Sequence, residues 1–230
     1  MKFGIVTFPG SNGDYDAYHA AAEALGEEAV YLWHKDHDLK DSDVVILPGG
    51  FSYGDYLRAG AIARFSPIMN EVVAHAKRGA PVLAICNGFQ VACEAGLLPG
   101  ALMRNISRRF ISRAVSLRVE NATSMFTHEY FAGQVLRLPV AHGDGRYVAE
   151  ADVVAALENE GRVALRYCAA DGSVGEADNL NGSVNSIAGI LNQSGNVLGM
   201  MPHPERAVDP LLGVPDGLGL FHSLLAGVAA

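Results

Sequence analysis

The sequence predicts an α/β fold with a mostly parallel central sheet flanked by helices and an antiparallel β extension. Three observations lead to this prediction. Over the first half of the chain, short apolar runs of strand length alternate with helical patterns, and turn residues follow most of these runs. Strands that alternate with helices form parallel sheets with right-handed crossovers. Beyond about residue 105 the first two apolar runs have no obvious helix between them, which predicts the antiparallel part.

The first half of the chain contains the elements expected of the parallel sheet. The predicted strands are residues 3–8, 29–33, 44–47 and 82–85. The predicted helices are residues 14–25, 64–78 and 87–95, of which the first two are closed by Gly26 and Gly79. Because the strands of a parallel sheet run in one direction, their carboxyl ends share one edge, where the active sites of such sheets lie.

The second half of the chain is richer in strands. The predicted strands are residues 113–120, 134–140, 162–167, 187–191 and 197–201, and residues 217–229 predict a closing helix. The turn signal Ser194-Gly195-Asn196 favours a hairpin between the last two strands. The chain has no internal repeat, low-complexity tract or linker, so residues 1–230 are expected to form a single domain.

Composition argues against several classes of function. The 230 residues carry a formal net charge of −8, which disfavours a nucleic-acid-binding surface. No apolar run is long enough to cross a membrane. The cysteines are odd in number and include no close pair, so neither a disulfide framework nor a zinc site is expected; they are Cys86, Cys93 and Cys168. The simplest expectation is a reduced, cytoplasmic setting.

Two polar clusters each have alternative interpretations. A metal site is suggested by His34, Asp36, His37 and Asp38, but these residues follow a strand in a polar loop without a second ligand cluster. We therefore expect them to be exposed to solvent, with no metal bound. The second cluster is a group of arginines, which could form a solvated strand face or a docking surface for a partner subunit. Its members are Arg104, Arg108, Arg109, Arg113 and Arg118.

The strongest candidate for a nucleophile is Cys86. The apolar run Val82–Ile85 ends at this residue, and a helical pattern follows it. In a nucleophile elbow, small residues lie two before and two after the nucleophile, and here they are Ala84 and Gly88. The helix dipole would favour the reactive thiolate. A buried structural cysteine is the alternative, and on this stretch alone the two interpretations are equally good.

The best candidate for a base is His203, which also follows an apolar strand. Pro204 biases His203 towards an extended backbone, in which residues i and i+2 point to the same side. Glu205 could therefore hold one imidazole nitrogen while the other faces the sulfur, as in a Cys-His-Glu triad. The alternative is a surface histidine beside a surface glutamate.

A pair of glycines, Gly49 and Gly50, follows the third predicted strand. Glycine lets backbone N–H groups approach a substrate closely. The N–H groups of Gly50 and Asn87 are therefore the natural donors for an oxyanion. An ordinary turn from strand to loop is the alternative, but the position beside the strand that carries Cys86 favours the oxyanion site.

Three segments together carry a family resemblance. They are Leu-Pro-Gly-Gly-Phe-Ser-Tyr-Gly-Asp (47–55), Ile-Cys-Asn-Gly-Phe-Gln (85–90) and Met-Met-Pro-His-Pro-Glu-Arg (200–206). Through them the chain resembles, nearly end to end, the class I or triad glutamine amidotransferases, and this resemblance implies a flavodoxin-like sheet. Ala-His-Gly-Asp-Gly-Arg-Tyr (141–147) and Asn-Gly-Ser (181–183) narrow the resemblance to the glutaminase subunits of purine biosynthesis.

The resemblance implies a thioester mechanism on this chain. It implies that Cys86 attacks the side-chain amide of glutamine. It also implies that His203 protonates the leaving ammonia and then activates the attacking water, and that Glu205 orients His203. It implies that the oxyanion is held by Gly50 and Asn87. The residues that it implies for binding glutamine are Gly49, Gln90, His142, Gly143 and Asp144.

The same resemblance implies no cofactor and no metal in this chain. Ammonia would pass to a separate ATP-dependent synthetase subunit, which would hold ATP and Mg and convert formylglycinamide ribonucleotide into its amidine. A small accessory subunit would complete the assembly. Three alternatives stay open: an amidotransferase subunit of another ammonia-using ligase, a free-standing thiol hydrolase on a similar fold, and a non-catalytic scaffold. An intact Cys, His and Glu argues against the scaffold, because an idle subunit needs none of them.

Overall fold

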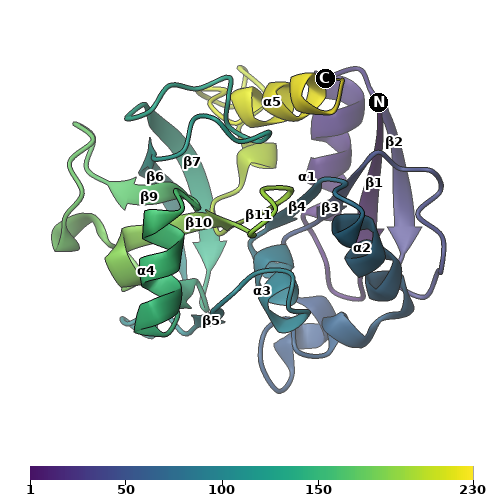
Figure 1. The fold of residues 1–230 in the computed structure, drawn as a ribbon, viewed down its shortest axis with the longest axis horizontal. Coiled ribbons are helices and arrows are strands. Elements are labelled where there is room, and N and C mark those ends of the chain that lie inside the picture. The colour runs from purple at the N-terminus through teal and green to yellow at the C-terminus, as the bar shows by residue number, and fades with distance from the viewer. Residues whose placement is uncertain (230) are drawn as a thin grey trace.

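A nine-stranded sheet runs through the protein in the computed structural model, which describes residues 1–229 (Figure 1). The strand order is β2-β1-β3-β4-β11-β10-β9-β6-β7. The first five strands in this order are parallel, as predicted. They are β2 (Glu28–Trp33), β1 (Lys2–Thr7), β3 (Val44–Leu47), β4 (Val82–Ile85) and β11 (Val197–Met200).

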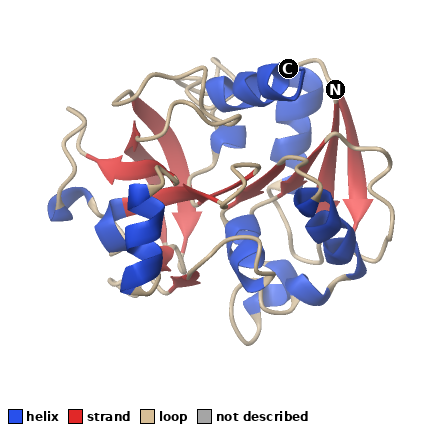
Figure 2. Ribbon diagram, in the orientation of Figure 1, coloured by secondary structure: helices blue, strands red, loops and turns tan. Residues whose placement is uncertain are grey.

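The other four strands extend the same sheet in antiparallel fashion (Figure 2). They are β10 (Ile187–Leu191), β9 (Val163–Cys168), β6 (Ile111–Val119) and β7 (Val135–His142). The predicted fold class is therefore confirmed, and β10 and β11 form the predicted hairpin. The last strand, β7, is an edge strand that pairs only with β6.

Helices cover both faces of the parallel half, with α1 and α5 above the sheet and α2 and α3 below it in Figure 1. They are α1 (Asp14–His19), α2 (Pro67–Lys77), α3 (Asn87–Glu94) and α5 (Leu218–Ala229). A π-helical turn continues α1 to Ala24, close to the predicted end. The helix α2 begins later than predicted because Pro67 favours the first helical position and holds the preceding Ser66 in an extended conformation.

Two strands and one α-helix were not predicted. The strands β5 (Ala101–Met103) and β8 (Arg146–Val148) form a separate two-stranded sheet, and their three residues each are too few to show a period. The helix α4 (Ala151–Asn159) is longer and buries Val154 and Leu157. The three-residue spacing of these two apolar side chains is a sequence signal for a helix. Within residues 1–229, no helix combines the length and the apolar character needed to cross a membrane.

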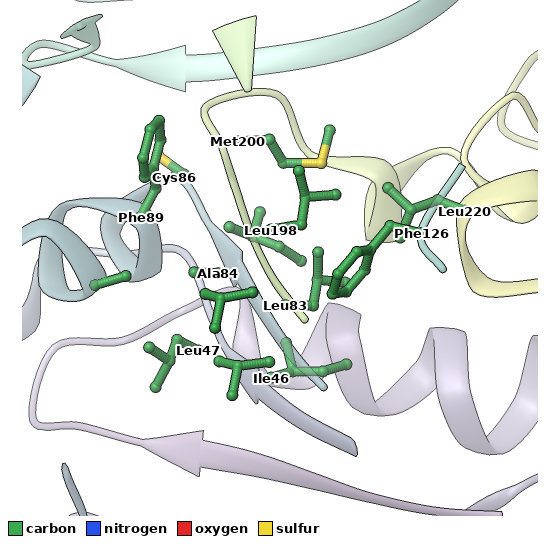
Figure 3. Close-up of a cluster of buried hydrophobic side chains, with 14 of the residues drawn as sticks. Ile46, Leu47, Leu83, Ala84, Cys86, Phe89, Phe126, Leu198, Met200 and Leu220 are labelled. Carbon is green, nitrogen blue, oxygen red and sulfur yellow. The ribbon is translucent and has the colours of Figure 1, made fainter. Parts of the chain in front are cut away.

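The core beneath the carboxyl ends of the central strands is continuously apolar. Every residue of β3, β4 and β11 is buried, because helices cover both faces of these strands. Figure 3 shows Leu83 and Leu198 packed within this core and Phe89 beside Cys86 at its end. A Cβ atom at Gly199 would overlap the Phe89 ring, so this glycine lets α3 pack directly on β11. The start of α3, next to Cys86, is thereby fixed against the sheet.

Candidate active site

Cys86 lies at a sharp turn between β4 and α3. Its backbone has φ +51° and ψ −104°, a conformation that is rare for residues other than glycine. The Cys86 N–H donates to the carbonyl of Met200 at 2.8 Å, which ties the turn to β11. A Cβ atom at Gly88 would overlap the carbonyl oxygen of Leu47, so only glycine fits where α3 passes β3. The geometry is that of the elbow expected from the sequence.

His203 lies just beyond the end of β11, the strand next to β4. Its Nδ1 is 2.6 Å from Oε1 of Glu205, and the two residues are 1% and 2% exposed. The Nε2 atom has no hydrogen-bond partner anywhere in residues 1–229. Burial lowers the pKa of His203, but the charges of Glu205 and of the Cys86 sulfur outweigh burial and raise this pKa overall. The carboxylate and the sulfur on either side of the ring thus favour its protonated form.

The edge strand β7 contributes backbone carbonyls to the same place. The carbonyl of Pro139 accepts a hydrogen bond from the His203 N–H at 2.9 Å, and the carbonyl oxygen of Ala141 lies 3.7 Å from Cys86 Sγ. Proline has no N–H for a sheet ladder and is tolerated on edge strands. The antiparallel half of the sheet thus helps to position both residues.

The two glycines after β3 fit closely against this pair. A Cβ atom at Gly49 would lie 2.7 Å from Cε1 of His203 and 3.5 Å from Cβ of Cys86. Gly50 has φ +141°, and a Cβ atom there would meet the backbone of Ser11 and Asn12 at 2.7 Å. No backbone hydrogen bond within the described chain uses the Gly50 N–H. The Asn87 N–H also has no acceptor within α3, because Asn87 is the first residue of this helix.

The side chain of Asn87 connects three segments around the site. Its Oδ1 accepts hydrogen bonds from the backbone N–H of Ser52, at 3.0 Å, and from the Ser52 hydroxyl. Its Nδ2 donates to Gln90 Oε1 at 2.7 Å and to Asp55 Oδ1 at 3.3 Å. Gln90 in turn donates from Nε2 to the carbonyl of Asp144 at 2.6 Å. One N–H of Gln90 therefore remains for a ligand, while the other N–H holds the loop at Asp144 and Oε1 is held by Asn87.

The network around His142 determines its tautomer. Asn105 Nδ2 donates to the carbonyls of Arg109 and His142, and Asn105 Oδ1 accepts from the Gly145 N–H. The remaining contact of this Oδ1, at 3.1 Å, must therefore be with a protonated Nδ1 of His142. Burial and the nearby His203 lower the pKa of His142 to about 4, so the ring is neutral at neutral pH. Its Nε2 is an acceptor and is unsuited to binding a carboxylate.

A pocket with a volume of about 240 Å³ opens beside Cys86. Of the expected site residues, Gly50, Cys86, Gln90, His142, Gly143 and Asp144 line it. The arginine group is split: Arg104, Arg108 and Arg109 line the pocket, whereas Arg113 and Arg118 lie on β6. Both earlier interpretations of this group are thus incomplete, because its first three members reach the candidate site from the loop before β6.

The expectation that the cluster after β2 is exposed was wrong for its first member. His34 is only 4% exposed, and its Nδ1 lies 2.7 Å from the Tyr53 hydroxyl. The same hydroxyl lies 2.9 Å from Oγ of Ser66. The buried histidine supports the loop that follows Gly50. This contact joins segments that are distant in the sequence, so sequence reasoning could not predict it.

Asp55 is a candidate functional residue that sequence reasoning missed. It is half-buried, lines the pocket and lies near Asp144. Burial and the charge of Asp144 raise the pKa of Asp55 to about 6, although the hydrogen bond from Asn87 lowers it. In the sequence it was only the last residue of the segment 47–55. Nothing in the spacing distinguished it from a surface aspartate.

Comparisons with known proteins identify the family of this chain. The family model described as a CobB/CobQ-like glutamine amidotransferase domain matches residues 1–213. A relative from Salinibacter ruber called phosphoribosylformylglycinamidine synthase subunit PurQ is 58% identical over 228 residues, covering 99% of this chain and 97% of the relative. A relative of the same name from Chlorobaculum tepidum is 59% identical over 229 residues, covering 100% and 98%.

A solved structure is also closely similar. A chain in the structure of PurLQS from Thermotoga maritima is 46% identical to this chain, with a TM-score of 0.86. The match covers 98% of this chain and 97% of that one. Since the family model and these relatives extend over nearly the whole sequence, the chain belongs to the CobB/CobQ-like glutamine amidotransferase family.

Proposed function

We propose that this chain is the glutaminase subunit of a phosphoribosylformylglycinamidine synthase. In this role it hydrolyses glutamine to glutamate and ammonia and passes the ammonia to a synthetase. The observation that carries the chemistry is the arrangement of Cys86 beside His203, whose Nδ1 is held by the buried Glu205. The likeness to full-length relatives that bear this name supports the choice of complex.

The first half of the reaction forms a thioester. The sulfur of Cys86 attacks the δ-carbon of the glutamine side chain, a carbon–sulfur bond forms, and the carbonyl oxygen becomes an oxyanion. The free N–H groups of Gly50 and Asn87 stabilise this oxyanion. The protonated Nε2 of His203 gives its proton to the amide nitrogen. The carbon–nitrogen bond then breaks, and ammonia leaves.

The second half of the reaction releases glutamate. A water molecule gives a proton to Nε2 of His203 as its oxygen attacks the thioester carbon. The carbon–sulfur bond breaks, and the sulfur of Cys86 is restored. Throughout both halves, Glu205 holds the Nδ1–H of His203, so that Nε2 is always the nitrogen that exchanges the proton.

The proposal also assigns partners and a compartment. Ammonia enters an ATP-dependent synthetase subunit, which uses ATP and Mg to convert formylglycinamide ribonucleotide into its amidine, and a small accessory subunit completes the complex. The similarity to a chain of the PurLQS structure supports such an assembly. We place it in the cytoplasm, since the three free cysteines, one of them the nucleophile, suit a reducing compartment.

The direct test is to purify the complex from its own organism through a tag on this chain and to measure amidine formation. We expect both glutamine and ammonium salts to serve as nitrogen donors. A complex that used only ammonia would overturn the glutaminase proposal. A chain that hydrolysed glutamine but purified with a different synthetase would overturn the choice of complex.

Glu205→Gln is expected to lower glutamine turnover by about 10²- to 10⁴-fold, because the neutral amide orients and stabilises the imidazolium less well. Cys86 should still react with a diazoketone analogue of glutamine, since the nucleophile and the pocket are intact. Turnover and the rate of labelling are measured on the same preparation of the complex.

Glu160→Gln is the matched control, because Glu160 pairs with Arg162 away from the site. It should retain wild-type turnover. Wild-type turnover in Glu205→Gln would contradict the role of Glu205 as the group that orients His203.

A further inference from the structure

A second hollow lies on β2, the edge strand at the opposite end of the sheet from β7 (Figure 1). It has a volume of about 310 Å³ and is lined by Thr7, Asp14, Tyr31 and Trp33. None of these residues lines the pocket beside Cys86. The reaction proposed at Cys86 therefore gives this β2 hollow no role.

Aromatic rings form much of the wall of the β2 hollow. Tyr31 and Trp33 alternate with the buried Leu32, so both side chains point to the same face of β2. Tyr18 of α1 stacks on Tyr31 with the ring centroids 4.8 Å apart, which fixes the orientation of that ring. Tyr31 and Trp33 are nevertheless 41% and 45% exposed. Two large rings are thus left open on the surface, and such rings are enriched among the residues that dominate protein interfaces.

Asp14 is the one charged residue that lines the β2 hollow within residues 1–229. Its carboxylate forms no ion pair in this part of the chain. The hydrogen bond that it accepts comes from the Ser11 hydroxyl at 3.3 Å. Burial and the charge of Asp14 raise the pKa of the Tyr31 hydroxyl, so the carboxylate acts on this ring. An unpaired negative charge beside aromatic faces favours a cation as the ligand.

Thr7 adds an unpaired hydrogen-bonding group to the β2 hollow. Its Oγ1 is buried and has no hydrogen-bond partner in the described chain. Thr7 of β1 pairs with Trp33 of β2 in the register of the sheet, so the hydroxyl lies beside the indole. Burying a hydroxyl without a hydrogen bond costs free energy. A ligand with several N–H donors would offset this cost.

An added β-strand is not the expected occupant, although β2 is an edge strand. Lys40 donates from Nζ to the carbonyl of Tyr31 at 2.8 Å. A lysine placed on an edge strand opposes pairing with another chain. The occupant should therefore enter the hollow through a side chain and not through its backbone.

We propose that the β2 hollow binds an arginine side chain of a protein partner. The planar guanidinium stacks on the face of Trp33 and donates two N–H groups to the carboxylate of Asp14. A further N–H is left for Oγ1 of Thr7. Lysine fits less well, because its ammonium is compact, strongly hydrated and unable to form the two parallel hydrogen bonds. The formal net charge of −8 also favours a basic partner.

The fluorescence of Trp33 measures this binding directly, because Trp33 is the only tryptophan of the chain. The full-length chain is titrated at low ionic strength with a capped pentapeptide of one arginine among alanines, with its lysine counterpart and with free arginine. We expect the arginine peptide to change the emission with a Kd of about 1–10 mM, as for one cation–π contact and one exposed ion pair. The lysine peptide should bind at least about threefold more weakly.

Two variants test the polar groups of the β2 hollow. Asp14→Asn should weaken binding of the arginine peptide by about three- to tenfold, because the charge is lost. Thr7→Val replaces the unpaired hydroxyl by a methyl group of similar size, so it should fold at least as stably as wild type. It should weaken binding by about two- to tenfold, as for the loss of a hydrogen bond. This second variant keeps the proposal testable if Asp14→Asn does not fold.

Asp152→Asn is the matched control for the change in charge. Asp152 is exposed on α4, which lies at the far end of the molecule from β2 in Figure 1. The control removes the same charge as Asp14→Asn and should keep the wild-type affinity for the arginine peptide. A loss of affinity in the control as large as in Asp14→Asn would show that the peptide responds only to net charge, which would overturn the proposal.

Three other results would also overturn it. One is equal affinity for the arginine and lysine peptides, or no response of Trp33 to either. Another is tighter binding of free arginine than of the arginine peptide, since the β2 hollow would then serve a small molecule. The third is a change in emission with the concentration of the chain alone, which would make a second copy of this chain the occupant.

Discussion

Cys86→Ala is expected to abolish glutamine-dependent amidine synthesis by the assembled complex and to leave ammonia-dependent synthesis intact. The variant removes the sulfur at the elbow between β4 and α3, so no thioester can form. The loss in glutamine turnover should be about 10⁴-fold or more, as for other nucleophiles of triads. Ammonia supplied in solution bypasses this chain and reaches the synthetase directly. Both rates are measured on one preparation, with glutamine and then an ammonium salt as donor.

Cys93→Ala is the matched control for this experiment. Cys93 lies on the same helix, its Sγ contacts the carbonyl of Pro99 at 3.8 Å, and burial raises its pKa far above the ordinary value. It should therefore stay a neutral thiol and contribute nothing to catalysis. Both synthesis rates of the control should match wild type. An equal loss of both activities in Cys86→Ala would show that Cys86 supports the complex and not the glutaminase step.

Gly88→Ala is expected to destabilise the fold by about 3 kcal/mol, the upper part of the range for overpacked sites. The new Cβ would overlap the Leu47 carbonyl, and a backbone atom of a central strand cannot give way as a flexible side chain can. The helix α3 must then move away from β3 and carry Cys86 and Asn87 with it. Glutaminase activity should disappear together with the stability. Urea unfolding of the isolated chain measures the first effect.

Gly79→Ala separates the crowding at Gly88 from the general cost of replacing glycine. Gly79 has φ +88°, and nothing lies within 4 Å of a Cβ atom built there. Only the backbone conformation opposes alanine, at about 1–2 kcal/mol. Equal unfolding midpoints for the two variants would contradict the close approach of α3 and β3.

The parallel half of the fold could be predicted because its strands are buried on both faces. Each of β3, β4 and β11 is a continuous apolar run that ends at a turn, so its type and bounds are readable. The strands β5 and β8 are short and pair only with each other, so their existence depends on a contact between distant segments. The helix α4 has a signal of its own in the sequence, the three-residue spacing of Val154 and Leu157.

The candidate site could be predicted where its residues lie at the ends of strands. Cys86 and His203 each follow a strand. The contact of Glu205 with His203 was also predicted, but its geometry was not, because Glu205 lies in the 3-10 turn Pro204–Arg206 and not on an extended backbone. The charge states of the neighbours could not be read in the same way. The tautomer of His142 depends on Asn105. The raised pKa of Asp55 depends on its burial and then on Asp144, which lies far away in the sequence. Such pairings come from loops whose paths the sequence pattern does not specify.

The contacts of β7 have a consequence for solubility. An edge strand presents unpaired backbone groups on which another chain can add a strand, and proteins protect such edges with prolines and covering segments. Here Pro139 removes one donor, and the segment around His203 and the elbow at Cys86 cover two of the carbonyls. The residues proposed for catalysis therefore also shield the open end of the sheet. Substitutions that detach the segment 202–206 should cause self-association as well as loss of activity, and light scattering would detect it.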